Sequence, residues 1–159
     1  MNGPHPPHNI FQVPEIGSFR DAAAAIIVMS DGRYLMQQRD DMPGIFYPDH
    51  WGLFGGAFEA GESSETALRR ELQEELGYAP DQMRYFTNME FDFECLGGRR
   101  CIRVFYEVEL TVEQLAQLRL TEGQSMEPLD IADILLNKRV VPYDSFAVWM
   151  HYARRHRTI

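Results

Sequence analysis

Six glutamates and no lysine or aspartate lie within the stretch GAFEAGESSETALRRELQEELGY, residues 56–78. Three of them, Glu71, Glu74 and Glu75, are spaced so that a helix would place their carboxylates in one sector of about 100°, beside a stripe of leucines. Carboxylates held together in this way repel one another and raise one another's pKa. A hard divalent cation that prefers oxygen ligands, such as Mg²⁺ or Mn²⁺, removes that repulsion. The pattern therefore predicts a cation site, and a solvated acidic helix face is the alternative.

Arg70 and two glycines accompany these glutamates. Because the guanidinium of Arg70 keeps its charge, it can hold Glu62 or a metal-binding glutamate in one orientation through charge-assisted hydrogen bonds. Gly55 and Gly56 have no side chains, so the backbone can approach the same place closely. A backbone carbonyl of this glycine pair is a candidate for a further ligand.

These residues form one fixed pattern, which runs Gly56, five residues, Glu62, seven residues, Arg70-Glu71-Leu72, one residue, Glu74-Glu75, one residue, Gly77-Tyr78. The pattern resembles the Nudix box, the defining motif of the Nudix hydrolases, at every fixed position. The resemblance extends over about residues 20–155, because Tyr34–Arg39 resembles the family's strand before the substrate loop. Trp51–Gly56 resembles the approach to the box, with Phe54 where proline is usual. The implied fold is α/β, an alpha/beta/alpha sandwich with a mixed β-sheet.

Carried over position by position, the resemblance makes Glu71, Glu74 and Glu75 the metal-binding carboxylates, Gly55 the carbonyl ligand and Arg70 the orienting residue. It implies Mg²⁺ as the cofactor and Mn²⁺ as a substitute. In such a site the metal ions neutralise phosphate oxygens and lower the pKa of a bound water, and a carboxylate takes the proton of that water. The implied enzyme is a pyrophosphohydrolase. It cleaves a nucleoside diphosphate linked to a group X into a nucleoside monophosphate and X-phosphate. When the substrate is a nucleoside triphosphate, the second product is pyrophosphate.

The segment Glu122-Gly123-Gln124 resembles the Glu-Gly-Gln segment that nucleoside-triphosphate-cleaving members place in a later loop. In those members the glutamate is another metal ligand or helps to position water, and an exposed loop residue is the alternative for Glu122. Glu71 and Glu122 are both candidates for the general base. The alternative to an enzyme is a catalytically silent module of the same fold that senses nucleotides, and the intact box favours the enzyme. Which nucleotide conjugate is cleaved stays open.

Four residues outside the box are weaker candidates for contacts with a small-molecule nucleotide substrate. Phe46 and Tyr47 lie in a proline-containing loop before the box, where aromatic rings can stack on a nucleobase. Arg39 is a candidate for a phosphate contact, or pairs with a nearby carboxylate. Asp144 is a candidate for accepting a hydrogen bond from a base amino group, and the favoured interpretation makes it the cap of the last helix. His50 is a weak candidate for an acid or phosphate donor.

Around these residues the sequence predicts two hairpins, an extended segment before the box, and three helices. The strands are expected at 22–29, 34–39, 51–56, 83–95 and 101–110. The helices are expected at 65–76, 112–118 and 142–156. Ser63 or Ser64 caps the first helix, Gly77 ends it, and Thr111 opens a capping box at the second. This order lacks repeated strand-helix-strand units, so it favours a mixed sheet packed between helices over a doubly wound parallel sheet.

Composition limits the remaining possibilities. With 159 residues, 45% of them hydrophobic, we expect one domain over residues 18–159 after an irregular, proline-rich arm at 1–17. A net charge of -9 argues against binding to duplex nucleic acid. Cys95 and Cys101 are expected to be reduced thiols in a hairpin, and no apolar run is long enough for a membrane span. The sequence thus predicts a soluble, cytoplasmic protein that does not bind membranes; its oligomeric state stays open, a homodimer included.

Overall fold

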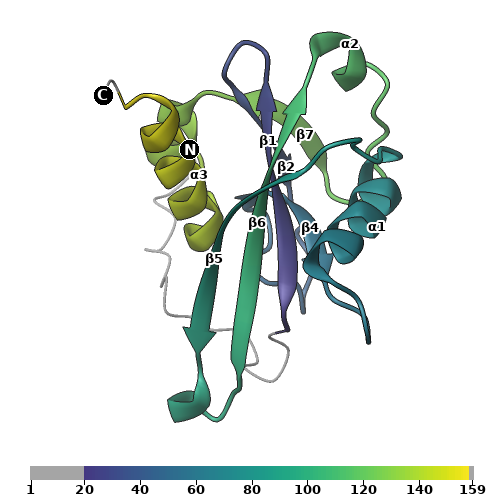
Figure 1. Ribbon diagram of the computed structural model, residues 1–159. Coiled ribbons are helices and arrows are strands. Elements are labelled where there is room, and N and C mark those ends of the chain that lie inside the picture. Colours follow the sequence, from purple (N-terminus) through teal and green to yellow (C-terminus); the bar gives the residue numbers. More distant parts are fainter. Residues whose placement is uncertain (1–19, 158–159) are drawn as a thin grey trace.

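The computed structural model describes residues 20–157, and the predicted arm at 1–17 lies outside this range. The strands of the described chain are β1 (Ala22–Met29), β2 (Tyr34–Gln38), β3 (Trp51–Gly52), β4 (Phe54–Ala57), β5 (Arg84–Asp92), β6 (Arg100–Leu110) and β7 (Ser125–Leu129). Its helices are α1 (Ser64–Leu76), α2 (Val112–Leu115) and α3 (Pro142–Arg155), with a 3₁₀ turn, η2 (Glu94–Leu96), and a π turn, η3 (Asp133–Asn137). Figure 1 shows α1 and α3 on opposite sides of the sheet.

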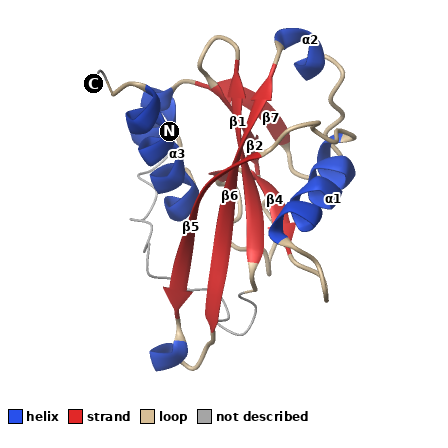
Figure 2. Ribbon diagram, viewed as in Figure 1, coloured by secondary structure: helices blue, strands red, loops and turns tan. Residues whose placement is uncertain are grey.

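The strands form one mixed sheet in the order β3-β2-β1-β6-β5, and two strands lie off this path, β4 beside β1 and β7 beside β2 (Figure 2). The central pair β1 and β6 is parallel, whereas β1 runs antiparallel to both β2 and β4. The predicted mixed sheet between helices is therefore confirmed.

The side chains of β1 alternate between the two faces of this sheet. Ala23, Ala25 and Ile27 pack in the core under α1, whereas Ala24 and Ile26 pack in the core under α3. Both faces are covered, which explains why β1 is a continuous apolar run despite its four alanines.

Helix α1 is placed by its caps and by its leucine stripe. Ser63 is the N-cap, and its hydroxyl accepts a hydrogen bond from the Thr66 N–H at 3.1 Å. Gly77 ends the helix at φ 63°, a left-handed conformation that glycine adopts without a steric cost. Leu68, Leu72 and Leu76 are fully buried on the sheet. The predicted helix is confirmed, and two of the glutamates adjoining this stripe, Glu71 and Glu75, lie against Gly56 and Gly55 of β4.

Other parts of the predicted pattern are wrong in detail. The extended segment 51–56 is divided at Leu53, because β3 pairs with β2 while β4 pairs with β1. Helix α2 stops at Leu115 rather than at residue 118, although its capping box at Thr111 is present. Strand β7 was not predicted, and it contains Pro128, which cannot donate a hydrogen bond to a neighbouring strand.

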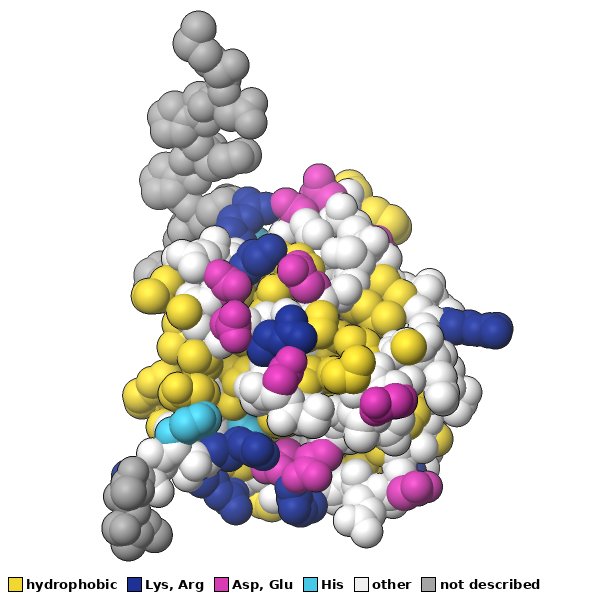
Figure 3. Space-filling view, turned by 90° about the horizontal axis from the view of Figure 1, so that it is seen from above, with side chains coloured by type: hydrophobic (Ala, Val, Ile, Leu, Met, Phe, Trp, Pro, Cys, Tyr) yellow, Lys and Arg dark blue, Asp and Glu magenta, His cyan; other side chains and the backbone are white. Residues whose placement is uncertain are grey.

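Three further observations concern the described residues. Cys95 and Cys101 are both free thiols, as predicted, the first exposed and the second buried. No helix among residues 20–157 has the length and apolar character needed to cross a bilayer. On the face shown in Figure 3, acidic and basic side chains are interspersed around apolar ones.

Candidate metal and nucleotide site

Arg70 lies at the centre of the charged face of α1. Its guanidinium donates to both carboxylate oxygens of Glu62, each at 2.9 Å, and to Glu71 at 2.8 Å. It also donates to Glu74 at 3.3 Å and to the Ala57 carbonyl of β4 at 3.1 Å. The hydrogen bond from Arg70 lowers the pKa of Glu62 to about 2. Arg70 thus holds three box glutamates and the end of β4 in one arrangement.

Glu71 lies against the backbone of Gly56. A Cβ atom added at Gly56 would be 2.5 Å from Glu71 Oε1 and 2.6 Å from Oε2, so any other residue there would displace this carboxylate from its present position. Burial raises the pKa of Glu71, and the charges of Glu74 and Glu122 raise it further, although Arg70 acts in the opposite direction. Arg70 therefore does not fully offset the effect of burial on the Glu71 carboxylate.

Glu75 is the most deeply buried carboxylate of the box, with an exposed fraction of 5%. Its Oε2 accepts from the Gly55 N–H at 2.9 Å, and its Oε1 accepts from Gln37 Nε2 at 3.2 Å. Burial raises the pKa of Glu75 to about 7, and the charges of Glu71 and Glu122 add to this, while the two hydrogen bonds oppose it. Gly55 offers its N–H to Glu75 here, and ligation by its carbonyl stays a prediction.

Glycine is required at position 55 because β4 approaches β1 closely there. Its φ is 131°, and a Cβ atom added there would lie 2.9 Å from Ala24 Cα. No other residue type fits this backbone without a shift of the strands. The Gly-Gly pair therefore has two separate functions, because Gly55 permits strand packing and Gly56 makes space for Glu71.

A cavity of about 80 Å³ brings together residues that are far apart in the sequence. Its lining residues are Gln37, Arg39, Asp40, Ile45, Glu75, Glu122 and Gly123. Glu122 thus faces the same cavity as Glu75, and Arg39 lies beside both. Gln37 and Asp40 were not singled out from the sequence, although two glutamines in the short strand YLMQQ were a signal of polar side chains near a site.

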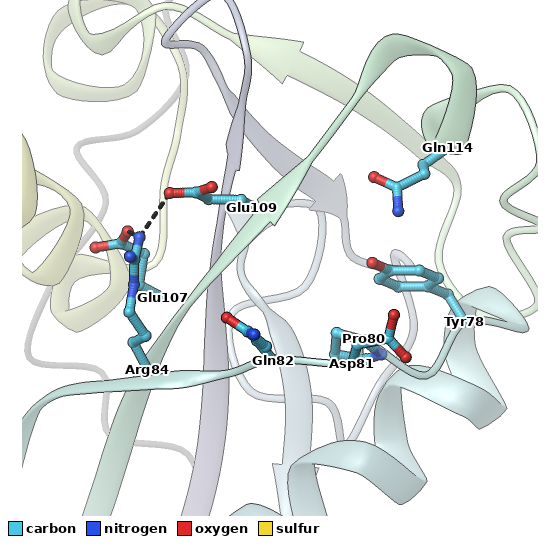
Figure 4. Close-up of a pocket in the computed structure, with 8 residues that line it drawn as sticks. All are labelled: Tyr78, Pro80, Asp81, Gln82, Arg84, Glu107, Glu109 and Gln114. Carbon is cyan, nitrogen blue, oxygen red and sulfur yellow. Dashed lines mark hydrogen bonds and ion pairs between the residues drawn. The ribbon is translucent and has the colours of Figure 1, made fainter.

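A larger cavity of about 260 Å³ lies elsewhere and contains no box carboxylate. It is lined in part by Tyr78, Arg84, Glu107 and Glu109 (Figure 4). Arg84 pairs with Glu107 and, at 2.6 Å, with Glu109. Its lining carries Arg84 against the carboxylates of Asp81, Glu107 and Glu109, so charge does not distinguish the two cavities; the smaller one differs because it contains the box carboxylate of Glu75.

The glutamates of the candidate site have the right chemistry to bind a hard divalent cation, but their present rotamers do not bring them together. Within residues 20–157, no three His, Cys, Asp or Glu side chains are gathered closely enough to hold a metal ion as they stand. Glu71 and Glu74 are turned to Arg70, and Glu75 is turned to Gly55. The donors are all oxygens, and two of the carboxylates have raised pKa values that a nearby cation would lower. The residue set therefore fits Mg²⁺ or Mn²⁺ after side-chain rotation.

The weaker candidates lie in the loop between β2 and β3. Arg39 donates to the Phe46 carbonyl at 2.8 Å, so its side chain braces the loop as well as lining the cavity. The ring of Tyr47 lies edge-on to those of His50 and Tyr143, with centroids 5.5 and 5.9 Å away. His50 Nδ1–H donates to the Pro48 carbonyl at 2.8 Å. Substrate contacts by Arg39, Phe46 and Tyr47 stay predictions.

The interpretation of Asp144 as a helix cap is wrong. The N-cap of α3 is Val141, and no side chain caps the helix. Asp144 lies in the first turn of the helix, is 1% exposed, and accepts from the Leu53 N–H at 3.0 Å and from Arg103 at 3.1 Å. A buried carboxylate needs such partners, and a side chain pointing into the core cannot cap the first turn. Contact between Asp144 and substrate stays a prediction.

Most of the chain is similar to known proteins. A family model described as NUDIX domain matches residues 18–150. A stretch of 51 residues is 49% identical to the nucleoside triphosphatase NudI of Escherichia coli O139:H28 (strain E24377A / ETEC), covering 32% of this chain and 36% of that protein. The match thus spans about a third of that relative's length.

Two solved structures extend the similarity over most of the chain. The MutT protein from Methanosarcina mazei Go1 superposes with a TM-score of 0.71 at 19% identity, covering 89% of this chain and 98% of that one. A MutT structure from work on Aliivibrio salmonicida and Vibrio cholerae has a TM-score of 0.66 at 30% identity, covering 84% and 97% of the two chains. The first of these shows a shared fold, and the second adds sequence similarity.

Proposed function

The chain belongs to the NUDIX family of hydrolases, and on that premise we propose that it is a Mg²⁺-dependent pyrophosphohydrolase. Its substrate is a nucleoside triphosphate or another nucleoside diphosphate derivative. The observation that carries this proposal is the convergence of Glu75 and Glu122, 47 residues apart, on one cavity beside Glu71. A set of coupled carboxylates at a small cavity is the environment that a divalent cation and its phosphate ligands require.

In this proposal Glu71, Glu74, Glu75 and Glu122 hold the metal, together with the Gly55 carbonyl. A bound cation neutralises phosphate oxygens and lowers the pKa of a water that it ligates. Arg70 orients Glu71 and Glu74 through the hydrogen bonds described above. Positive charge near Glu75 would increase its ionisation near neutral pH, since burial raises its pKa to about 7.

The proton of the attacking water goes to a carboxylate, and Glu71 and Glu122 are the two candidates. Arg39 is the proposed phosphate contact, and its position in the lining of the cavity beside Glu122 supports this role. Phe46 and Tyr47, in the loop that follows Arg39, are the proposed contacts for the rest of the nucleotide. Cleavage yields a nucleoside monophosphate and X-phosphate, or pyrophosphate when the substrate is a triphosphate. The similarity to a protein described as a nucleoside triphosphatase makes nucleoside triphosphates the first substrates to test.

The experiment that tests this function incubates the purified protein with Mg²⁺ and a panel of nucleotides in ¹⁸O-labelled water. We expect cleavage of a pyrophosphate linkage, label in one phosphate product, loss of activity with chelator, and recovery with Mg²⁺ or Mn²⁺. Full turnover after exhaustive removal of metal would refute the mechanism. Tight nucleotide binding without turnover of any panel member would instead support the sensing module.

A pair of variants tests the role of Glu122. We expect Glu122→Gln to lower kcat by roughly 10-fold or more and to raise the Mg²⁺ concentration needed for half-maximal rate, because a ligand charge is lost. Glu127→Gln is the control, since Glu127 is exposed and pairs with Lys138 at 3.7 Å. If both variants behave alike across a Mg²⁺ titration, Glu122 does not serve the metal or the water.

A further inference from the structure

The loop that carries Glu122 is held in place by an aspartate from a different loop. We propose that Asp49 is a positioning residue that fixes the Glu122 loop against β2, and so couples it to the loop between β2 and β3. This inference rests on the proposed function, because it assigns Asp49 a task only if Glu122 serves the metal or the water. The contacts of Asp49 carry the argument.

The carboxylate of Asp49 joins three separate segments. Its Oδ1 accepts from Gln38 Nε2 of β2 at 2.8 Å and from Gln124 Nε2 at 3.3 Å. Its Oδ2 accepts from the guanidinium of Arg139, which precedes α3. One side chain therefore connects a strand, the Glu122 loop and the chain leading into α3.

Further contacts join the Glu122 loop to β2 and to the residues that follow it, together with those of Asp49. The Gln124 N–H donates to the Gln38 carbonyl at 2.8 Å, and Gln124 Nε2 donates to the Arg39 carbonyl at 2.8 Å. The Gly123 N–H donates to Asp40 at 3.3 Å. Gly123 has φ 85°, and a Cβ atom there would lie 2.9 Å from the Gln38 carbonyl oxygen. The backbone just after Glu122 is thus pressed onto β2, and the side chain of Gln124 is the part that Asp49 holds.

The backbone of Asp49 is set for this task. Its φ is 58°, a left-handed conformation that aspartate tolerates better than most residues and that turns its carboxylate toward β2. Its N–H donates to the Asp40 carbonyl at 3.2 Å, and the Arg39 N–H donates to the His50 carbonyl at 2.9 Å. The two stems of the loop are therefore tied together at the point where Asp49 meets Gln124.

A functional consequence follows from this connection. Phe46 and Tyr47, the proposed nucleotide contacts, lie in the loop whose last turn is Asp49. A shift of that loop moves Asp49, which moves Gln124 and with it the neighbouring Glu122. The position of Glu122 thus depends on the position of the loop that meets the nucleotide.

The test compares three variants. Asp49→Gly removes the carboxylate without strain at positive φ, and Asp49→Asn keeps an acceptor oxygen for Gln38 and Gln124. Asp31→Gly is the matched control, because Asp31 also pairs with an arginine, Arg33, at 2.7 Å, but in the distant turn between β1 and β2. The readouts are kcat, KM, the Mg²⁺ concentration for half-maximal rate, and amide hydrogen exchange without metal.

We expect Asp49→Gly to raise the Mg²⁺ requirement about 5- to 25-fold, because it removes the hydrogen bonds from Gln38 and Gln124, which are each worth about fivefold. The amides of Gly123 and Gln124 should exchange faster in the absence of metal. Asp49→Asn and Asp31→Gly should stay within about twofold of wild type. In a Glu122→Gln background, Asp49→Gly should leave the Mg²⁺ requirement unchanged, because residues acting as one unit are not additive.

Several outcomes would overturn the inference. If Asp49 only stabilises the fold, Asp49→Gly would lower the melting temperature and kcat but leave the Mg²⁺ requirement and the amide exchange of residues 123 and 124 unchanged. An effect of Asp49→Gly that adds fully to that of Glu122→Gln would also overturn the inference. If Asp49→Gly fails to fold, Gln124→Ala breaks the same contact from the other side and should give the same rise in Mg²⁺ requirement. If Glu122→Gln has no effect, the proposed role of Glu122 is refuted. If Glu122→Gln has the expected effect but the Asp49 and Gln124 variants have none, only the positioning role of Asp49 is refuted.

Discussion

Glu75 makes the stability of the metal-free protein depend on pH, and replacing it with glutamine should remove that dependence. The side chain is 5% exposed, and burial raises its pKa from the ordinary 4.5 to about 7. The folded state therefore binds this proton more tightly than the unfolded state. The resulting stabilisation is fully present below pH 4.5 and is lost as pH rises through about 7.

The size of the effect follows from the same two values. The difference between them is about 2.5 pKa units, and each unit corresponds to about 1.36 kcal/mol, so the loss is at most about 3 kcal/mol. The glutamine in the Glu75→Gln variant is neutral at every pH, and its amide oxygen can still accept from the Gly55 N–H. We therefore expect this variant to match wild type near pH 5 and to exceed it in free energy of unfolding by up to about 3 kcal/mol at pH 8.

The assay is urea denaturation in chelator at several pH values between 5 and 8, for wild type and for Glu75→Gln. Subtracting the free energy of unfolding of wild type from that of the variant removes the contributions of titrating groups that do not contact Glu75. Glu65→Gln is the control on the same helix, because Glu65 is exposed and pairs with Arg69 at 3.0 Å. Added Mg²⁺ should then stabilise wild type at pH 8 more than the variant.

A specific result would refute this reasoning. If the stability difference between Glu75→Gln and wild type is the same at pH 5 and pH 8, Glu75 does not titrate in this range. The burial of Glu75 would then not control its ionisation, and it would no longer support the inference that this carboxylate needs a cation.

Three further predictions concern α1 and its surroundings. Gly56→Ala should lower kcat on the order of 10²-fold without unfolding the protein, because its Cβ would lie 2.5 Å from a Glu71 oxygen; unchanged kinetics would contradict this. Arg70→Gln should lower the free energy of unfolding by about 1 to 3 kcal/mol in denaturant titrations, since it leaves Glu71 without its charged donor. Leu72→Ala should lower that free energy by about 2 to 5 kcal/mol, because Leu72 is fully buried; a loss below about 1 kcal/mol would mean that α1 packs differently.

The local sequence determined the elements whose signals repeat over a short distance. Helix α1 has its cap at Ser63, its leucines at a helical period and its stop at Gly77, and the structure confirms each of these. The continuous apolar run of β1 indicated burial on both faces, and both faces are covered. Glu71, Glu74 and Glu75 lie on α1, so their common sector follows from helical geometry alone.

Tertiary structure decided the features that join distant segments. Strand β7 exists because β2 offers it a partner, although the proline within it weakens any local strand signal. Asp144 resembled a helix cap in sequence, but pairing with Arg103, 41 residues away, draws its carboxylate into the core. No local pattern predicts such a pairing, because its free energy comes from burial and from a partner that only the folded chain supplies.

The features of the candidate site also divide into those that the local sequence predicts and those that only the tertiary structure decides. The sequence predicts Glu71, Glu74 and Glu75 as candidate ligands, because their spacing on one helix is a local property. The contacts that orient them were not predictable in this way: Gln37 reaches Glu75 across 38 residues, and Asp49 reaches Gln124 across 75. Spacing along one helix follows from backbone geometry, whereas the depth of Glu75 and the position of Glu122 depend on how the sheet brings β2, β4 and the later loop together.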